Sequence, residues 1–214
     1  MMKIISWNIR GLNGRSKQRI LRDCIKTENP DILLLQETKC AGREAENIFR
    51  NSWKNGEFLY QDSVGAAGGL AILWNPQVVT LLHPFSTRNT ITTLYKDMAS
   101  SKDDAITNVY GPQSMQDKER FIRSLQYVQI LIHTPHWIIG GDFNMILTLE
   151  EKIGGSKRLE QDSGMFKTLI EQLNMVDMET QNGIFTWSNK RTGHQHVACR
   201  LDRFIVTEAL LESD

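Results

Sequence analysis

A run of four consecutive apolar residues, Ile32-Leu33-Leu34-Leu35, constrains the fold of this chain more than any other feature. The run lies between Asp31 and Gln36 and contains no polar residue. Strands that are buried on both faces show this continuous apolar pattern, whereas strands with one exposed face alternate apolar and polar residues. The run therefore predicts a strand that is covered on both sides.

Similar reasoning predicts the other elements. Strands are expected over residues 3–7, 68–74, 78–82, 90–95, 105–110, 136–141, 185–187 and 200–206, and helices over 16–29, 43–53, 117–133 and 161–173. Asn75-Pro76 and Pro84 are interpreted as turns between strands. Buried strands, hairpins and amphipathic helices in this order are typical of an α/β fold with two packed sheets and helices outside them.

Size and composition narrow the class of protein. With 214 residues, 40% hydrophobic and 23% charged, the chain is expected to form one globular domain. No apolar run approaches the ~18 residues of a membrane span, and the N-terminus lacks the features of a secretory signal. Three scattered cysteines do not suit a disulfide framework or a thiolate zinc site. We therefore expect an intracellular protein that is not secreted and does not bind membranes.

The charge pattern leaves two interpretations open. The formal net charge is zero, so there is no global attraction to nucleic acid. Residues 1–26 nevertheless carry seven basic side chains against one acidic side chain, Asp23. This end of the chain could favour a polyanion, or the charges could form an ordinary solvated helix face.

Polar residues gather at the ends of the predicted strands, where a rigid sheet could direct them into one cleft. Glu37 follows the buried run directly, and a buried carboxylate is costly unless it meets a cation or a hydrogen-bond donor. Magnesium suits such a position, because it binds one or two protein carboxylates and completes its shell with water and phosphate. The alternative is a carboxylate that caps the next turn.

Asp142 and Asn144 stand two residues apart after a predicted strand, so in extended backbone both would point to one side. The carboxylate could take a proton from an attacking water, and the amide could hold that water or a phosphate oxygen. An ordinary Asp/Asn turn is the competing interpretation. Tyr110 also ends a predicted strand, where its phenol could donate to a phosphate oxygen or simply pack against neighbouring side chains. Asn8 ends another predicted strand, where it could lie beside a metal ion or form a turn.

The order of these segments identifies a resemblance to a known family. The motifs are Trp7 to Asn13, Gln36-Glu37-Thr38, Asn108 to Pro112, Gly140 to Asn144 and Arg200 to Phe204. Together they resemble the endonuclease/exonuclease/phosphatase superfamily over nearly the whole chain. Gly68 to Ala71, Phe185 to Asn189 and Arg200 to Arg203 are most similar to the endonuclease domain of plant non-long-terminal-repeat (LINE-type) retrotransposons.

The resemblance implies a four-layer α/β sandwich and a magnesium-dependent hydrolase that cuts DNA, with Mn²⁺ as an alternative metal. It implies Glu37 and Asn8 at the metal, Asp142 activating water, and Asn144 with Tyr110 stabilising the transition state. Asp202 would orient a histidine. Substrate contacts are predicted at Arg10, Trp187, Asn189 and Arg203. DNA as partner, a nuclear location and a monomer are further expectations.

Two departures from the family pattern qualify these expectations. Abasic-site enzymes usually have an acidic or amide residue where this chain has Arg10, so abasic specificity is not carried over. The family also ends with a strand that bears Ser-Asp-His, whereas this sequence ends at Ser213-Asp214. The sequence therefore predicts a domain incomplete at its C-terminus, without the last strand, that nicks DNA poorly or not at all.

Alternative functions stay open at this level. The same fold could act on a phosphoinositide, a sphingolipid or a nucleotide, or the chain could be an inactive remnant that only binds nucleic acid. His194 and His196 stand two residues apart and could bind a transition metal if extended, although a hairpin loop is the preferred interpretation.

Overall fold

The computed structural model describes residues 2–64, 68–155 and 161–212. The basic pair Lys157-Arg158 and the terminal Ser213-Asp214 therefore lie outside the described residues. The chain has an α/β fold with two mixed sheets flanked by helices, as the sequence predicts. It divides into two compact units, unit 1 (Met1–Tyr110 and Ile139–Gly141) and unit 2 (Gly111–Ile138 and Asp142–Asp214).

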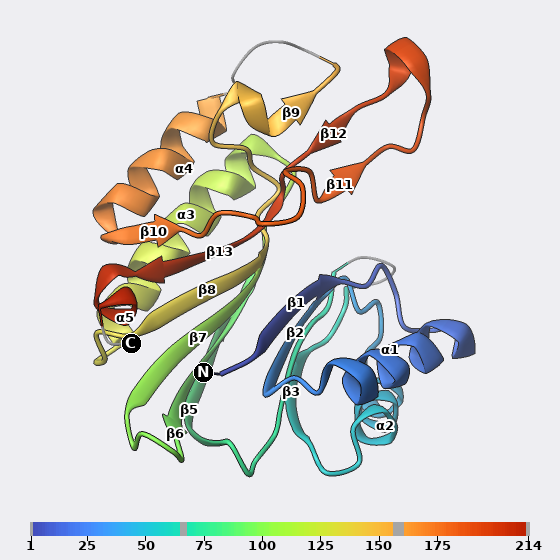
Figure 1. The fold of residues 1–214 in the computed structure, drawn as a ribbon, viewed down its shortest axis with the longest axis vertical. Helices are drawn as coiled ribbons and strands as arrows, with labels where there is room; N and C mark the ends of the chain where they lie inside the picture. Colours follow the sequence, from blue (N-terminus) through green and yellow to red (C-terminus); the bar gives the residue numbers. More distant parts are fainter. Residues whose placement is uncertain (1, 65–67, 156–160, 213–214) are drawn as a thin grey trace. The chain divides into compact units, whose positions relative to one another are not determined.

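The first sheet of unit 1 has the strand order β1-β2-β4-β3 (Figure 1). Its strands are β1 (Ile4–Asn8), β2 (Ile32–Gln36), β3 (Glu57–Gln61) and β4 (Leu70–Trp74). Strands β1 and β2 are parallel, and the other pairs are antiparallel. All five residues of β2 are buried, which confirms the prediction of a strand covered on both faces.

Helices α1 (Arg15–Glu28) and α2 (Gly42–Ser52) cover one face of this sheet (Figure 1). Leu21 of α1 and Phe49 of α2 are fully buried in one cluster with Leu33 and Leu35 of β2. The apolar side chains recur at helical spacing, so each helix presents one stripe to the sheet. Helix α1 ends at Glu28, and its cap residue Asn29 has a left-handed backbone and precedes Pro30.

Unit 1 also contains an antiparallel meander of β5 (Val79–Thr87), β6 (Thr90–Asp97) and β7 (Asp103–Tyr110). Pro84 does not end a strand, contrary to the prediction, because β5 continues through it opposite Thr93. Strand β5 lies at the edge of its sheet. An edge strand tolerates proline because the backbone N–H groups on its outer side make no hydrogen bonds to another strand.

Unit 2 contains α3 (Met115–Leu131), α4 (Gln161–Gln172) and the antiparallel pair β10 (Met175–Asp177) and β13 (Asp202–Thr207). Ser114 caps α3, because its hydroxyl accepts from the Asp117 N–H at 3.3 Å. Phe143 packs between Phe121 and Phe166, with ring centroids 6.4 and 4.9 Å apart. Strand β8 (Trp137–Asp142) contributes residues to both units.

The remaining elements of unit 2 are short. They are the small sheet of β9 (Lys152–Ile153), β11 (Trp187–Ser188) and β12 (Ala198–Cys199), the 3-10 turns Leu149–Glu151 and Gly193–Gln195, and α5 (Glu208–Leu211). Sequence patterns missed β3, β9, β10, β12 and α5. In the described part of the chain, no helix has the length and apolar character required to cross a membrane.

Candidate active site

Glu37 stands at the end of β2, beside the end of β1. Because β1 and β2 are parallel and Asn8 is paired with Gln36, the two strands end at the same edge. The Asn8 carboxamide donates through Nδ2 to Oε1 of Glu37 at 2.9 Å. Glu37 itself has a left-handed backbone with φ 51°, which an L-residue adopts only when its surroundings impose it.

Backbone hydrogen bonds on both sides impose this turn. On one side, the N–H groups of Gly11 and Leu12 donate to the carbonyls of Glu37 and Thr38 at 2.7 and 2.9 Å. On the other side, the Thr38 N–H donates to the Gly69 carbonyl at 3.1 Å. The segment that carries Glu37 is therefore held between two neighbouring segments of the same unit.

Lys39 and Tyr110 complete the surroundings of Glu37. The Lys39 ammonium lies 3.3 Å from Oε2, and the Tyr110 phenol at the end of β7 also hydrogen-bonds the carboxylate. Burial alone would raise the pKa of Glu37. The hydrogen bonds from Asn8, Lys39 and Tyr110 and the charge of Lys39 outweigh burial and hold this pKa below its ordinary value. Glu37 is therefore an ionised carboxylate at neutral pH.

This donor set fits a magnesium ion. A carboxylate and a neighbouring amide present hard oxygen atoms, and magnesium needs few protein ligands when water and phosphate complete its shell. The described residues hold no cluster of three or more His, Cys, Asp and Glu side chains, so a site built from many protein ligands is not present among them. Glu37 would supply the anionic ligand and Asn8 the neighbouring oxygen.

Asp142 and Asn144 form a second polar group, in unit 2. Strand β8 ends at Asp142, and Asn144 has a left-handed backbone with φ 52°. The Asn144 N–H donates to Oδ1 of Asp142 at 3.0 Å, and Nδ2 of Asn144 donates to the Gly111 carbonyl at 2.6 Å. The expectation of an extended backbone that points both side chains to one side is therefore wrong, because the chain turns between them.

The same turn is held by a close backbone approach. Gly111 donates through its N–H to the Asp142 carbonyl at 2.7 Å. A Cβ atom on Gly111 would lie 2.0 Å from the Phe143 carbonyl oxygen, so only glycine fits there. The glycine of Tyr110-Gly111-Pro112 therefore lets the backbone come close enough to hydrogen-bond both Asp142 and Asn144.

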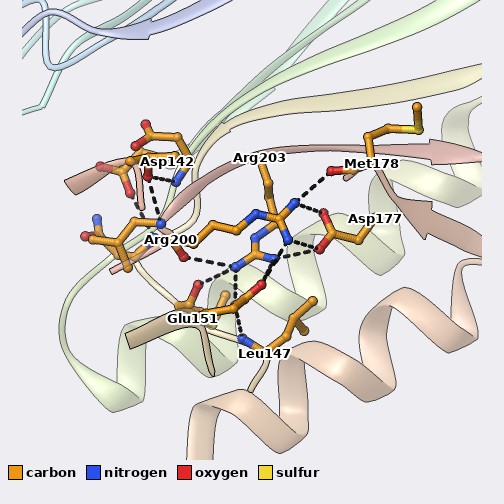
Figure 2. A network of polar contacts seen from close by, with 12 residues as sticks. Asp142, Leu147, Glu151, Asp177, Met178, Arg200 and Arg203 are labelled. Atoms are coloured by element: carbon orange, nitrogen blue, oxygen red, sulfur yellow. Dashed lines mark hydrogen bonds and ion pairs between the residues drawn. The ribbon is translucent and has the colours of Figure 1, made fainter. Parts of the chain in front are cut away.

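Arg200 and Arg203 join two carboxylates in a buried network of unit 2 (Figure 2). Arg200 makes two parallel hydrogen bonds to Asp177, both 2.9 Å long, and a third to Glu151 at 3.0 Å. Arg203 donates to Oε1 and Oε2 of Glu151 at 3.0 and 2.9 Å and to Asp177 at 2.8 Å. The network joins the start of β13 to the turn before β9 and to β10.

Arg203 does not fit its predicted role in substrate binding. Its side chain is 0% exposed, and its guanidinium also donates to the carbonyls of Met145 and Arg200. The Phe166 ring covers the guanidinium, with Cζ 5.3 Å from the ring centroid. A guanidinium enclosed in this way holds the fold together. Asp202 next to it starts β13, and its N–H donates to the Thr186 hydroxyl at 3.0 Å.

The other predicted substrate residues differ in their surroundings. Arg10 is exposed and has a left-handed backbone. Trp187 is half-buried opposite Cys199 in the β11–β12 pair. The Asn189 side chain serves its own loop, because it accepts from the N–H groups of Arg191 and Val197 and donates to the Gln195 carbonyl.

The two histidines of this loop are separated by their contacts. The His196 ring nitrogen lies 3.2 Å from the Ser188 hydroxyl, and His194 is exposed in the turn Gly193–Gln195. These positions match the loop between β11 and β12 that the sequence predicts.

The predicted site residues thus fall into two groups. Asn8, Glu37 and Tyr110 come together in unit 1, and Asp142 and Asn144 come together in unit 2, which also contains Asp202. The sequence interpretation missed Lys39, Glu151 and Asp177. Lys39 directly follows the Gln36-Glu37-Thr38 motif, and this position beside Glu37 is the only sequence signal for it. Glu151 and Asp177 lie in segments without a motif.

Known proteins resemble the chain over nearly its whole length. A DNA-(apurinic or apyrimidinic site) endonuclease of Dictyostelium discoideum is 26% identical over 242 residues, which cover 99% of this chain. The chain spans 64% of the length of that relative. A 40-residue stretch is 58% identical to the DNA repair nuclease APEX1 of Danio rerio and covers 19% of this chain and 13% of that protein.

Solved structures show the same fold. The AP endonuclease LMAP from Leishmania major has a TM-score of 0.80 and 20% identity, over 99% of this chain and 80% of that one. The endonuclease domain of TRAS1, a telomere-specific non-LTR retrotransposon, has a TM-score of 0.75 and 15% identity, over 99% and 88% of the two chains. The model of the Endonuclease/Exonuclease/phosphatase family matches residues 5–214, and the chain therefore belongs to this family.

Proposed function

We propose that this chain is a magnesium-dependent endonuclease that hydrolyses phosphodiester bonds in DNA. The observation that carries the proposal is the Glu37 carboxylate, kept ionised by Asn8, Lys39 and Tyr110 at the edge where β1 and β2 end. Membership of the family and the likeness to a relative named as a DNA endonuclease support the reaction class.

The group in unit 1 would bind the metal and one oxygen of the phosphate. Glu37 and Asn8 would hold the ion, which when bound neutralises negative charge that develops on the phosphate. The Tyr110 phenol has one O–H, which hydrogen-bonds the Glu37 carboxylate in this structure and would turn to a non-bridging phosphate oxygen when substrate binds. The Lys39 ammonium, which pairs with Glu37, supplies a further positive charge beside the phosphate.

The family resemblance assigns Asp142 and Asn144 to the attacking water. The Asp142 carboxylate would take a proton from the water as the water oxygen attacks phosphorus. The bond from phosphorus to the 3′ oxygen would break, and that oxygen would take a proton from solvent to give the 3′-hydroxyl. The Asn144 amide would stabilise charge in the transition state. Its bond to the Gly111 carbonyl uses one of its two N–H hydrogens, so the carboxamide is oriented before substrate arrives.

We further propose that the DNA substrate is a target site nicked for a LINE-type retrotransposon. The motif segments around Gly68, Phe185 and Arg200 support this specificity, as does the fold shared with the TRAS1 domain. A nuclear site of action would follow from that role. Arg10 and Trp187 are proposed as DNA contacts, since neither is fully buried.

Nicking of supercoiled plasmid with and without magnesium tests the proposal. We expect the nicked circle to accumulate only with magnesium, to carry a 3′-hydroxyl that a polymerase extends, and to disappear in Asp142→Asn. Equal nicking by wild type and Asp142→Asn would indicate a contaminant and count against the proposal. Phosphate release from monoesters without nicking would favour a phosphatase.

A further inference from the structure

Two fully buried carboxamides connect distant parts of unit 1. Gln36 is the last residue of β2, and Asn108 lies in β7. Both are 0% exposed, and Nε2 of Gln36 donates to Oδ1 of Asn108 at 2.6 Å. A buried amide is costly unless it is hydrogen-bonded, so each side chain depends on the other.

The orientation of this pair follows from its neighbours. Nδ2 of Asn108 donates to the carbonyls of Leu35 and Ala71, both at 2.9 Å. Since these acceptors require the nitrogen of Asn108, its oxygen must face Gln36, and Gln36 must present its nitrogen. Nε2 of Gln36 also donates to the Ser6 hydroxyl at 3.1 Å. One network therefore ties β7 to β1, β2 and β4.

The network adjoins both ends of the hydrogen bond between Glu37 and Tyr110. Glu37 directly follows Gln36, the last residue of β2, and has a left-handed backbone. The direction of its carboxylate therefore depends on the position of Gln36. Asn108 and Tyr110 are two residues apart in β7, so their side chains leave the strand on the same face. Fixing Gln36 against Asn108 therefore fixes the carboxylate relative to the phenol.

The pair also leaves one polar atom unsatisfied. Oε1 of Gln36 is buried and has no hydrogen-bond partner within the described part of the chain. Apolar side chains of similar size would fill this space without that penalty. The amide pair therefore contributes more to orienting the neighbouring side chains than to the free energy of unfolding.

We propose that Gln36 and Asn108 are positioning residues for the active site, which set the Glu37 carboxylate and the Tyr110 phenol for magnesium and phosphate. The inference rests on the proposed function. Residues that orient metal ligands typically change metal affinity or activity by about 10- to 100-fold when they are removed.

Three variants separate positioning from stability: Gln36→Met, Asn108→Leu and the double variant. Each single variant leaves a buried amide without its partner and should lower the urea midpoint, whereas the double variant should recover part of that loss. All three should lower kcat for plasmid nicking about 10- to 100-fold, with KM for DNA unchanged. Wild-type kcat in the double variant would overturn the proposal.

Thr92→Val is the matched control. Thr92 and Thr107 are buried and share a hydrogen bond of 2.9 Å between β6 and β7. Its loss should lower stability in the same way without a change in kcat. A fall in kcat equal to that of Gln36→Met would mean that loss of any buried hydrogen bond here impairs the enzyme, and the proposal would be wrong.

Amide hydrogen exchange keeps the inference separate from the proposed function. If the wild-type chain does not nick DNA with magnesium, the proposed function fails, but the exchange test still applies. The N–H groups of Thr38 and Lys39 donate to the carbonyls of Gly69 and Gly68, both at 3.1 Å. We expect these amides to lose protection in Gln36→Met and to keep it in Thr92→Val. Unchanged protection in Gln36→Met would overturn the positioning role.

Discussion

Asn8 donates to the Glu37 carboxylate across the parallel pair of β1 and β2, at 2.9 Å between Nδ2 and Oε1. This contact joins residues 29 positions apart that both stand where their strands end. The Asn8 amide is a neutral donor, so the contact orients the Glu37 carboxylate without neutralising its charge.

Replacing Glu37 with glutamine should remove the response to magnesium. We expect wild-type Tm to rise as magnesium is titrated and Glu37→Gln to show no rise, because the anionic ligand is absent. The value of kcat should fall about 10²- to 10³-fold, since charge stabilisation worth several kcal/mol is lost. Glu57→Gln, at an exposed position in β3, is the control and should respond like wild type. Equal magnesium responses in Glu37→Gln and wild type would contradict the assignment.

Replacing Asp142 with asparagine should affect turnover far more than stability. The asparagine oxygen can still accept from the Asn144 N–H, so the turn is retained. It cannot take a proton, and kcat should fall about 10²- to 10⁴-fold with KM little changed. Single-turnover nicking and urea unfolding measure the two effects. A variant that loses activity only because it unfolds would not support the role as base.

Alanine at Gly69 should destabilise the chain more than alanine at Gly68. Both glycines have positive φ, 87° and 75°, so either alanine costs about 1–2 kcal/mol of backbone strain. A Cβ at Gly69 would also lie 2.3 Å from the Thr38 hydroxyl, whereas at Gly68 it meets nothing within 4 Å. Overpacking should add about 1–3 kcal/mol at Gly69. Urea unfolding measures the difference, and equal losses in the two variants would refute the packing argument.

The buried network of Figure 2 should make stability depend on acid. Burial alone would raise the pKa of Glu151, but hydrogen bonds from Arg203 and Leu147 and the charges of both arginines outweigh it and lower the pKa. A carboxylate with a lowered pKa contributes its full stability above its unfolded pKa of about 4.3. That contribution is lost as the pH falls through the lower, folded pKa.

Urea unfolding of Glu151→Gln tests this dependence. At pH 7 the variant should lose about 3–5 kcal/mol, because two buried arginines lose a carboxylate partner. The difference from wild type should begin to shrink as the pH falls below the unfolded pKa of about 4.3 and should vanish only below the lower, folded pKa, where wild-type Glu151 also becomes neutral. Glu179→Gln, at an exposed position, is the control and should follow wild type at each pH. A difference that does not depend on pH would show that charge is not the cause.

Most of the fold could be predicted because it depends on local patterns. The continuous apolar run of β2 and the helical spacing of α1 to α4 are visible in the sequence, and the structure confirms these elements. Strands of two or three residues such as β9, β10 and β12 are too short to carry a period of two. Pro84 was misinterpreted because its tolerance depends on the edge position of β5.

The candidate site was predictable in its residue types but less so in its contacts. The order of strand-end motifs indicated Asn8, Glu37, Tyr110, Asp142 and Asn144 and the family to which the chain belongs. The structure brings the first three together and assigns Arg203 to a buried network instead of the substrate.

The helices α1 to α4, the longer strands and the chemistry available at their ends can be predicted from the sequence, because they follow from side chains close together in the chain. The partner of each charged group depends on the tertiary structure. The hydrogen bond from Asn8 to Glu37, 29 positions apart, and the pairing of Gln36 with Asn108, 72 positions apart, illustrate this. Burial and hydrogen bonds between distant segments decide whether a side chain is stable in its charged form. Neither can be obtained from patterns of neighbouring residues in the sequence.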